Sequence, residues 1–161
     1  MTQRNLWAPW RVEFIRGPRS GECIFCTKLN GKDDEENLVL IRWDKSFAML
    51  NLFPYNNGHT MVVPNRHVRY PSELDAEEAE ELWLGVCRVM DALKRVYSPE
   101  GFNLGANVGA VSGAGFEHFH VHVVPRWPGD TNFMPVIADV KVISEHVRST
   151  YKLLKQALAG P

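Results

Sequence analysis

Apolar residues recur along this chain with two different periods, and the change of period separates the expected strands from the expected helices. Three short apolar runs, at residues 37 to 43, 46 to 52 and 59 to 64, are separated by turn-forming residues that include the segment FPYNNG. Short apolar runs bounded by Gly, Pro and Asn are typical of strands joined by tight turns. This part of the sequence predicts an antiparallel meander.

The segment that begins at Asp75 has the helical period instead. Asp75 and Glu78 have the spacing of an N-terminal capping box, in which each side chain bonds the backbone of the other residue. Cys87 falls in or beside the apolar stripe, so we expect a buried core thiol there. The apolar residues that recur every three or four positions are Leu82, Val86, Val89, Leu93 and Val96.

Two further strands and a last helix complete the expected fold. The strands are expected at 102 to 108 and 118 to 124, joined by the glycine-bearing loop GAVSGAGFE. Ser144 is the expected cap of the last helix. The apolar positions of that helix are Val147, Tyr151, Leu154 and Leu158. The sequence therefore predicts an α+β fold with about five antiparallel strands, one long helix and a C-terminal helix.

Length and composition favour one domain over residues 1 to 161. A chain of 161 residues with 45% hydrophobic content can bury one ordinary core but not two comfortable ones. We expect an N-terminal extension at 1 to 22, a core at 23 to 125, and a C-terminal segment and helix at 126 to 161. Trp7 and Trp10, in the extension, are expected to cover the core or a partner subunit.

Charge and cysteine content exclude several classes of function. The net charge is −1 and the basic residues are spread along the chain, so we expect no nucleic acid or membrane partner. No apolar stretch approaches the roughly 18 residues of a membrane span, and no secretion signal is apparent, which favours a cytoplasmic protein. Three cysteines in such a chain make a disulfide framework a poor interpretation.

The segment EHFHVHVVPRW places histidine at every second position, at His118, His120 and His122. On a strand these three rings share one face, roughly 6.5 to 7 Å apart. The preceding loop is rich in glycine and can turn its N–H groups toward an anion, which suggests a phosphate site. Neutral imidazole is a competent nucleophile toward phosphorus, so this chemistry requires no catalytic metal.

These residues resemble a known family. HFHVHVV matches the His-x-His-x-His-x-x signature of the histidine triad superfamily of nucleotide hydrolases and transferases. LNLFPYNNGHTMVVPNRHV resembles a second segment of that family. VPRWPGDTNFMPV is similar to a prokaryotic branch related to the fragile histidine triad proteins and to bacterial diadenosine tetraphosphate phosphorylases. Matches run from about Leu6 to the last helix, and the resemblance implies a homo-oligomer, either a dimer or larger.

The resemblance implies a role for each matching residue. His120 would attack the α-phosphorus of a nucleoside polyphosphate and form a nucleotidyl-histidine. His122 would contact the transferred phosphoryl group or the bridging oxygen, and His59 would line the same site. Asn51 would bind the ribose hydroxyls, and Asn107 would contact the phosphates.

The loop before the triad departs from the family pattern. Many relatives carry a glutamine and then a serine or threonine four and three residues before the first triad histidine, where this chain has Ala114 and Gly115. We expect Ser112 and the backbone amides from Gly113 through Ala114 to Gly115 to replace those contacts. Arg126, after the triad, is a candidate to reach a long polyphosphate together with Trp127, with a purely structural role as the alternative.

The segment CIFC places Cys23 and Cys26 at the spacing of a zinc knuckle, which needs two more nitrogen or sulfur ligands. Related triad proteins build a structural zinc site from residues at the places of His67 and His118, so the resemblance implies these two ligands. The alternative is a pair of reduced, unliganded thiols. A thioredoxin-like motif is disfavoured, because no strand leads through CIFC into a clear helix.

The sequence thus favours an enzyme that cleaves dinucleoside polyphosphates such as diadenosine tetraphosphate. Three alternatives stay open: a metal hydrolase whose triad histidines bind catalytic zinc, a non-catalytic module that binds adenine nucleotides, and a nucleoside phosphoramidate-type hydrolase. The acceptor is water or phosphate. Retention of the third triad histidine, His122, favours water, whereas the longer match to VPRWPGDTNFMPV favours phosphate.

Overall fold

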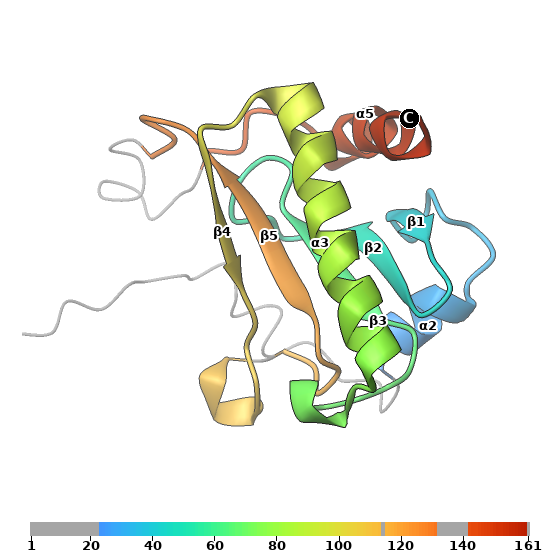
Figure 1. Cartoon of the computed structure of the whole chain (residues 1–161). Helices are drawn as coiled ribbons and strands as arrows, with labels where there is room; N and C mark the ends of the chain where they lie inside the picture. The colour runs from blue at the N-terminus through green and yellow to red at the C-terminus, as the bar shows by residue number, and fades with distance from the viewer. Residues whose placement is uncertain (1–22, 114, 132–141, 161) are drawn as a thin grey trace, which may run out of the picture.

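The computed structural model describes residues 23–113, 115–131 and 142–160, and Figure 1 shows the arrangement of their helices and strands. Trp7, Trp10 and Ala114 lie outside these residues. The elements, in chain order, are α2 (Ile24–Asn30), β1 (Val39–Arg42), β2 (Ser46–Leu50), β3 (Thr60–Pro64), the 3-10 turn η1 (Pro71–Glu73), α3 (Ala76–Tyr97), β4 (Gly101–Gly105), the 3-10 turn η2 (Ala110–Ser112), β5 (Val121–Arg126) and α5 (Val147–Ala159).

The five strands form one antiparallel sheet in the order β1-β2-β3-β5-β4. The predicted α+β fold is therefore confirmed. β5 lies between β3 and β4, and its register pairs His122 with Met61 on one side and Gly105 on the other. This central position holds the end of the histidine segment firmly in the sheet.

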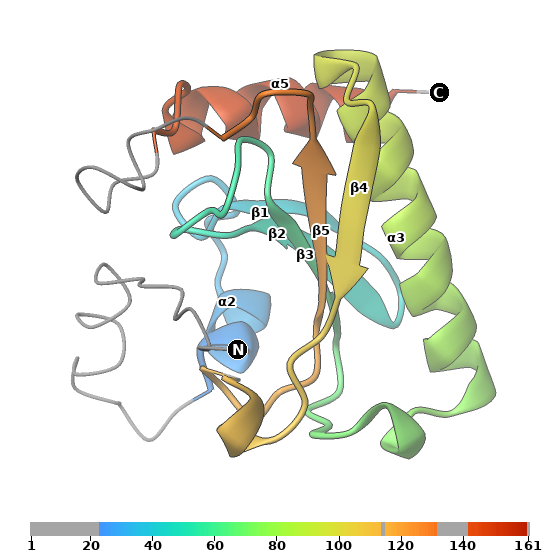
Figure 2. The same ribbon diagram turned by 90° about the vertical axis from the view of Figure 1, so that its left-hand side faces the viewer.

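The two faces of the sheet are covered differently. α3 and α5 pack on one face, whereas α2 lies on the other, as Figure 2 shows. Alternate residues of each strand point to opposite faces, so β3 places Val62 against α3 and its neighbours Met61 and Val63 on the α2 side. His122, paired with Met61, lies on the α2 side.

The predicted capping box of the long helix is confirmed. The Asp75 side chain accepts a hydrogen bond from the Glu78 backbone N–H at 2.8 Å, and the Glu78 carboxylate accepts one from the Asp75 N–H at 3.0 Å. Arg66 also pairs with Glu78 at 2.6 Å. This ion pair, together with the hydrogen bond from the Asp75 N–H, lowers the pKa of Glu78 to about 2.

Two other expectations, for Cys87 and for the cap of the last helix, are wrong. Cys87 is exposed. His146, rather than Ser144, caps α5, by accepting from the Arg148 N–H at 3.2 Å.

The triad segment and the CIFC segment differ from expectation in secondary structure. His118 and His120 precede β5, which begins only at Val121, so a single residue of the triad lies in the strand. CIFC opens a helix: Cys23 is the N-cap of α2 and Cys26 lies in its first turn.

In the described part of the chain, no helix is both long and apolar enough to cross a membrane.

Candidate active site

A cavity of about 360 Å³ lies on the α2 side of the sheet and brings together residues from distant parts of the sequence. Its volume is at the lower end of the range for ligand pockets, ~300 to 1,000 Å³. Its polar lining contains six of the residues expected at the site, namely Asn51, Asn107, Gly113, Gly115, His120 and His122. Its apolar lining includes Ile24, Phe25, Leu38, Met49 and Phe53. The cavity thus joins an imidazole end to an apolar wall.

His120 is buried and held in one tautomer. Its Nδ1 lies 2.8 Å from the backbone oxygen of His118. Since a carbonyl only accepts hydrogen bonds, Nδ1 carries the proton and donates it, and Nε2 keeps its lone pair. Burial lowers the pKa of His120, opposed by the hydrogen bond to His118. His120 is therefore a neutral imidazole at pH 7 with Nε2 available as a nucleophile.

A chain of hydrogen bonds sets the tautomer of His122. The Tyr55 backbone N–H donates to His59 Nδ1 at 3.1 Å, so His59 carries its proton on Nε2. His59 Nε2 lies 2.9 Å from His122 Nδ1 and donates to it. His122 therefore carries its own proton on Nε2. The ring centroids of His120 and His122 lie 4.7 Å apart, closer than the roughly 6.5 to 7 Å spacing of alternate residues on a regular strand.

His59 lies behind His122 and does not line the cavity. Its contribution is indirect, since it orients His122 and fixes the position of its proton. Burial, with the nearby His122 and His120, lowers the pKa of His59 to about 3.

This low pKa predicts a loss of stability in mild acid. The unfolded chain binds a proton at His59 below a pH of about 6.5, whereas the folded protein resists it down to about 3, so stability falls as the pH falls between these values. Between pH 7 and pH 5, we expect the free energy of unfolding of His59→Gln to fall by about 2 kcal/mol less than that of the wild type. Urea unfolding at the two pH values measures this difference. The exposed His146→Asn variant, in which asparagine can keep the cap of α5, serves as the control. If the free energy of unfolding of His59→Gln fell with pH as steeply as that of the wild type, the assignment of His59 as a buried neutral ring would be contradicted.

The loop before the triad has the expected glycine conformations. Gly109 and Gly113 have φ of 84° and 86°, which favour glycine. Gly113 and Gly115 line the cavity. Ser112 is not among the lining residues, and its hydroxyl donates to the Gly109 carbonyl at 2.7 Å. Its expected contact to the leaving group therefore has no support from this arrangement.

Arg126 and Trp127 bond to neighbouring parts of the fold. The Arg126 guanidinium forms a two-pronged ion pair with Asp130 at 2.6 and 2.9 Å and donates to Asn103 at 2.7 Å. The Trp127 Nε1–H donates to the Tyr97 carbonyl at 3.1 Å. Neither residue lines the cavity, which favours the alternative of a structural role for both.

The cavity also has a charged end that no sequence motif indicates. Lys28, Glu36 and Arg148 line it, and Arg148 bonds Glu36 at 2.8 Å. Burial lowers the pKa of Lys28, opposed by Glu36. α2, the turn before β1 and the start of α5 meet only in the folded chain, so spacing in the sequence gives no signal for this end.

The four expected metal ligands lie together. The ligand atoms of Cys23, Cys26, His67 and His118 all lie within 4.8 Å of one another. The Cys23 sulfur is 3.3 Å from His118 Nδ1, and the Cys26 sulfur is 3.3 Å from His67 Nδ1. Tetrahedral zinc, with Zn–S of about 2.3 Å and Zn–N of about 2.0 Å, separates its ligand atoms by roughly 3.3 to 3.8 Å. The cluster therefore fits such an ion.

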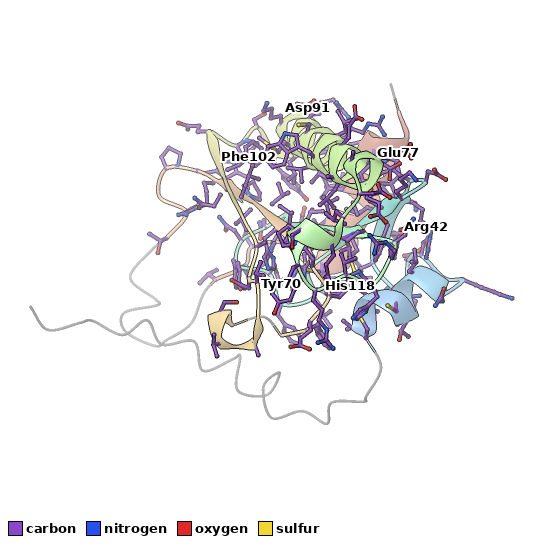
Figure 3. The ribbon with its side chains drawn as sticks, turned by 60° about the horizontal axis from the view of Figure 1, so that its bottom comes forward. Arg42, Tyr70, Glu77, Asp91, Phe102 and His118 are labelled. Atoms are coloured by element: carbon purple, nitrogen blue, oxygen red, sulfur yellow. The ribbon has the colours of Figure 1, made fainter. Side chains whose placement is uncertain are left out.

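His118 presents the correct nitrogen to this cluster. Its Nε2–H donates to the Pro64 carbonyl at 3.0 Å, which leaves the Nδ1 lone pair toward the thiols. Burial lowers the pKa of His118 to about 4, so the ring is neutral as a ligand must be. Figure 3 labels His118 next to α2, the blue helix. Because His118 turns its Nδ1 to the cysteines, it does not share a metal ion with His120 and His122, which disfavours the metal hydrolase alternative.

Comparison with known proteins agrees with this geometry. The model of the HIT domain matches residues 32–129. The chain is 41% identical over 160 residues to the AP-4-A phosphorylase of Mycobacterium tuberculosis (strain ATCC 25618 / H37Rv), covering 94% of this chain and 82% of that protein. It is 35% identical over 120 residues to the bis(5'-adenosyl)-triphosphatase of Dictyostelium discoideum, covering 74% of this chain and 66% of that protein.

Solved structures show the same fold. A Zn-bound histidine triad family protein from Mycobacterium smegmatis superposes with a TM-score of 0.69 at 23% identity, over 87% of this chain and 95% of that one. A hypothetical histidine triad nucleotide-binding protein from Sulfolobus tokodaii strain7 superposes with a TM-score of 0.66 at 28% identity, over 84% of this chain and 89% of that one. With the triad, the cavity and the matched HIT domain in agreement, the chain belongs to the histidine triad family.

Proposed function

We propose that this protein cleaves dinucleoside polyphosphates at the α-phosphate through a covalent nucleotidyl-His120 intermediate. The observation that carries the proposal is the buried His120 ring, whose Nδ1 bonds the His118 carbonyl while the ring lines the cavity. A fixed, neutral imidazole with one free lone pair has the properties of a phosphorus nucleophile. The names of the relatives, an AP-4-A phosphorylase and a bis(5'-adenosyl)-triphosphatase, support the substrate class.

The proposed reaction has two displacements. His120 Nε2 attacks the α-phosphorus, and the bond from that phosphorus to its bridging oxygen breaks with the electron pair leaving on the oxygen. The Nε2–H of His122 donates a hydrogen bond to this oxygen as its charge develops. Water or phosphate then attacks the nucleotidyl group, the phosphorus–nitrogen bond breaks, and the electron pair returns to His120 Nε2.

The cavity offers a contact for each part of the nucleotide. The apolar wall that contains Phe25 and Met49 would take the base. The Asn51 Oδ1 accepts from the Phe53 N–H at 2.9 Å, which leaves the amide N–H groups of Asn51 for the ribose hydroxyls. Gly113 and Gly115, beside Asn107, would hold the phosphates through backbone N–H groups.

We propose that Cys23, Cys26, His67 and His118 hold a structural zinc ion. When bound, the ion would close a tetrahedral site with no open position for substrate and would stabilise the fold. The ligand separations and the His118 tautomer support this assignment. The cytoplasmic location, expected from the sequence, and the homo-oligomer, implied by the family resemblance, remain predictions.

The acceptor is the finer part of the proposal, and we propose phosphate. The relative named as a phosphorylase matches 94% of the chain at 41% identity, whereas the relative named as a triphosphatase matches 74% at 35% identity. We therefore expect diadenosine tetraphosphate to yield ATP and ADP when phosphate is supplied, and ATP and AMP more slowly without it.

Chromatography of the products at several phosphate concentrations tests this expectation. ADP should rise with phosphate at the expense of AMP. AMP as the sole partner of ATP at saturating phosphate would show a hydrolase, and no cleavage in either condition would leave a nucleotide-binding module.

A further inference from the structure

Phe25 connects the cysteine pair with the nucleophile. It is the second residue of α2, it lies between Cys23 and Cys26 in the sequence, and it is the only buried residue of that helix. Its side chain is 3% exposed. The ring centroid lies 4.7 Å from that of His120, with the two planes tilted by 42°. Phe25 is thus an apolar wall against the nucleophilic ring.

The same aromatic ring contacts the metal cluster. Phe25 meets the ring of His118 edge-on at 5.5 Å, and His118 is both a cluster residue and the residue whose carbonyl holds His120 Nδ1. The adjacent Phe119 N–H donates to the Val68 carbonyl at 2.7 Å, next to the cluster residue His67. Phe25 and His118 therefore link the cluster directly to His120, and the segment of His67 holds the neighbouring Phe119.

We infer that Phe25 is a positioning residue for His120, and that the cluster of Cys23, Cys26, His67 and His118 keeps it in place. This inference rests on the proposed function, because it assigns His120 as the nucleophile. The hydrogen bond from Nδ1 sets the tautomer only while the ring keeps this orientation. The last torsion of histidine is broad, and a ring that flips loses the bond and with it the fixed tautomer. The Phe25 ring stands against one face of His120 and offers no hydrogen-bond partner to a flipped ring, so it favours the orientation with Nε2 free.

The experiment compares Phe25→Leu with Phe47→Leu. Phe47 belongs to the same buried cluster as Phe25 but does not line the cavity, so its substitution controls for lost core packing. We expect both variants to bind metal as the wild type does and to lose similar stability. Turnover at saturating diadenosine tetraphosphate should fall about tenfold or more in Phe25→Leu and stay within about twofold in Phe47→Leu. Turnover is compared at saturating substrate so that a change in binding, expected because Phe25 also lines the cavity, does not enter the comparison.

A second readout does not depend on activity. Nitrogen NMR of the His120 ring in the metal-loaded protein should show protonated Nδ1 and bare Nε2 in the wild type and in Phe47→Leu, and a mixture in Phe25→Leu. The Cys23→Ser variant, which is expected to lose the metal, should show the same mixture. If Phe25→Leu does not fold, Phe25→Met is measured instead.

Equal losses of turnover in the two variants, or an unchanged His120 spectrum in Phe25→Leu, would overturn the positioning role. If the wild type forms no nucleotidyl-His120, the proposed function fails, while the NMR comparison still tests what Phe25 does to the ring.

Discussion

The His120→Asn variant should lose at least about 10³-fold in kcat while nucleotide binding remains measurable. The asparagine amide can still donate to the His118 carbonyl and fill part of the imidazole site, but it has no lone pair able to attack phosphorus. The cavity is otherwise unchanged, so the loss falls on the chemical step rather than on binding. Single-turnover kinetics with diadenosine tetraphosphate and a binding titration with AMP separate the two effects.

His146→Asn is the matched control for this prediction. His146 is an exposed histidine at the start of α5, outside the cavity that contains His120. It should keep wild-type turnover within about twofold, because His146 is exposed and asparagine, a preferred N-cap residue, can still cap α5. Turnover of His120→Asn within tenfold of the wild type would exclude the covalent mechanism.

Purified protein should contain about one zinc ion per chain, and its removal should lower the melting temperature by about 10 °C or more. Four protein ligands already lie at tetrahedral separations, so the free energy of metal binding adds to that of folding. For a domain of this size, 10 °C corresponds to roughly 3 kcal/mol. Elemental analysis together with thermal unfolding before and after chelation measures both quantities.

The third cysteine provides the control. Cys87 is exposed on α3 and belongs to no part of the metal cluster, so Cys87→Ser should keep the metal and the melting temperature. Cys23→Ser should lose the metal and melt earlier. Metal-free wild type with unchanged melting behaviour would refute a structural zinc ion.

Periodicity predicted the parts of the fold whose burial repeats regularly. The apolar stripe of α3 buries Leu82, Val86, Val89 and Leu93, and its start follows directly from the Asp75 capping box. α2 escaped prediction because Phe25 is its only buried residue, and one residue makes no repeat. His146 escaped as the cap of α5 because histidine is not among the preferred N-cap residues.

The site was predictable where a motif carries it and not where only tertiary contacts do. His120, His122 and Asn51 were recognised from their segments and lie around one cavity. Lys28 and Arg148, 120 residues apart, line its charged end and belong to no common motif. Arg126 shows the reverse case, since its place after the triad suggested phosphate, yet Asp130, four residues on, binds its guanidinium. Local ion pairs of this kind depend on the loop conformation after β5.

The most direct test of the central claim is mass spectrometry of the enzyme quenched in alkali during turnover of diadenosine tetraphosphate. Alkali is used because the phosphorus–nitrogen bond of a nucleotidyl-histidine is labile to acid. We predict a mass increase of one adenylyl group in the wild type, located on the peptide that contains His120 and absent from His120→Asn. Rapid cleavage of the substrate with no adduct at any time point, or an adduct on another residue, would contradict the account.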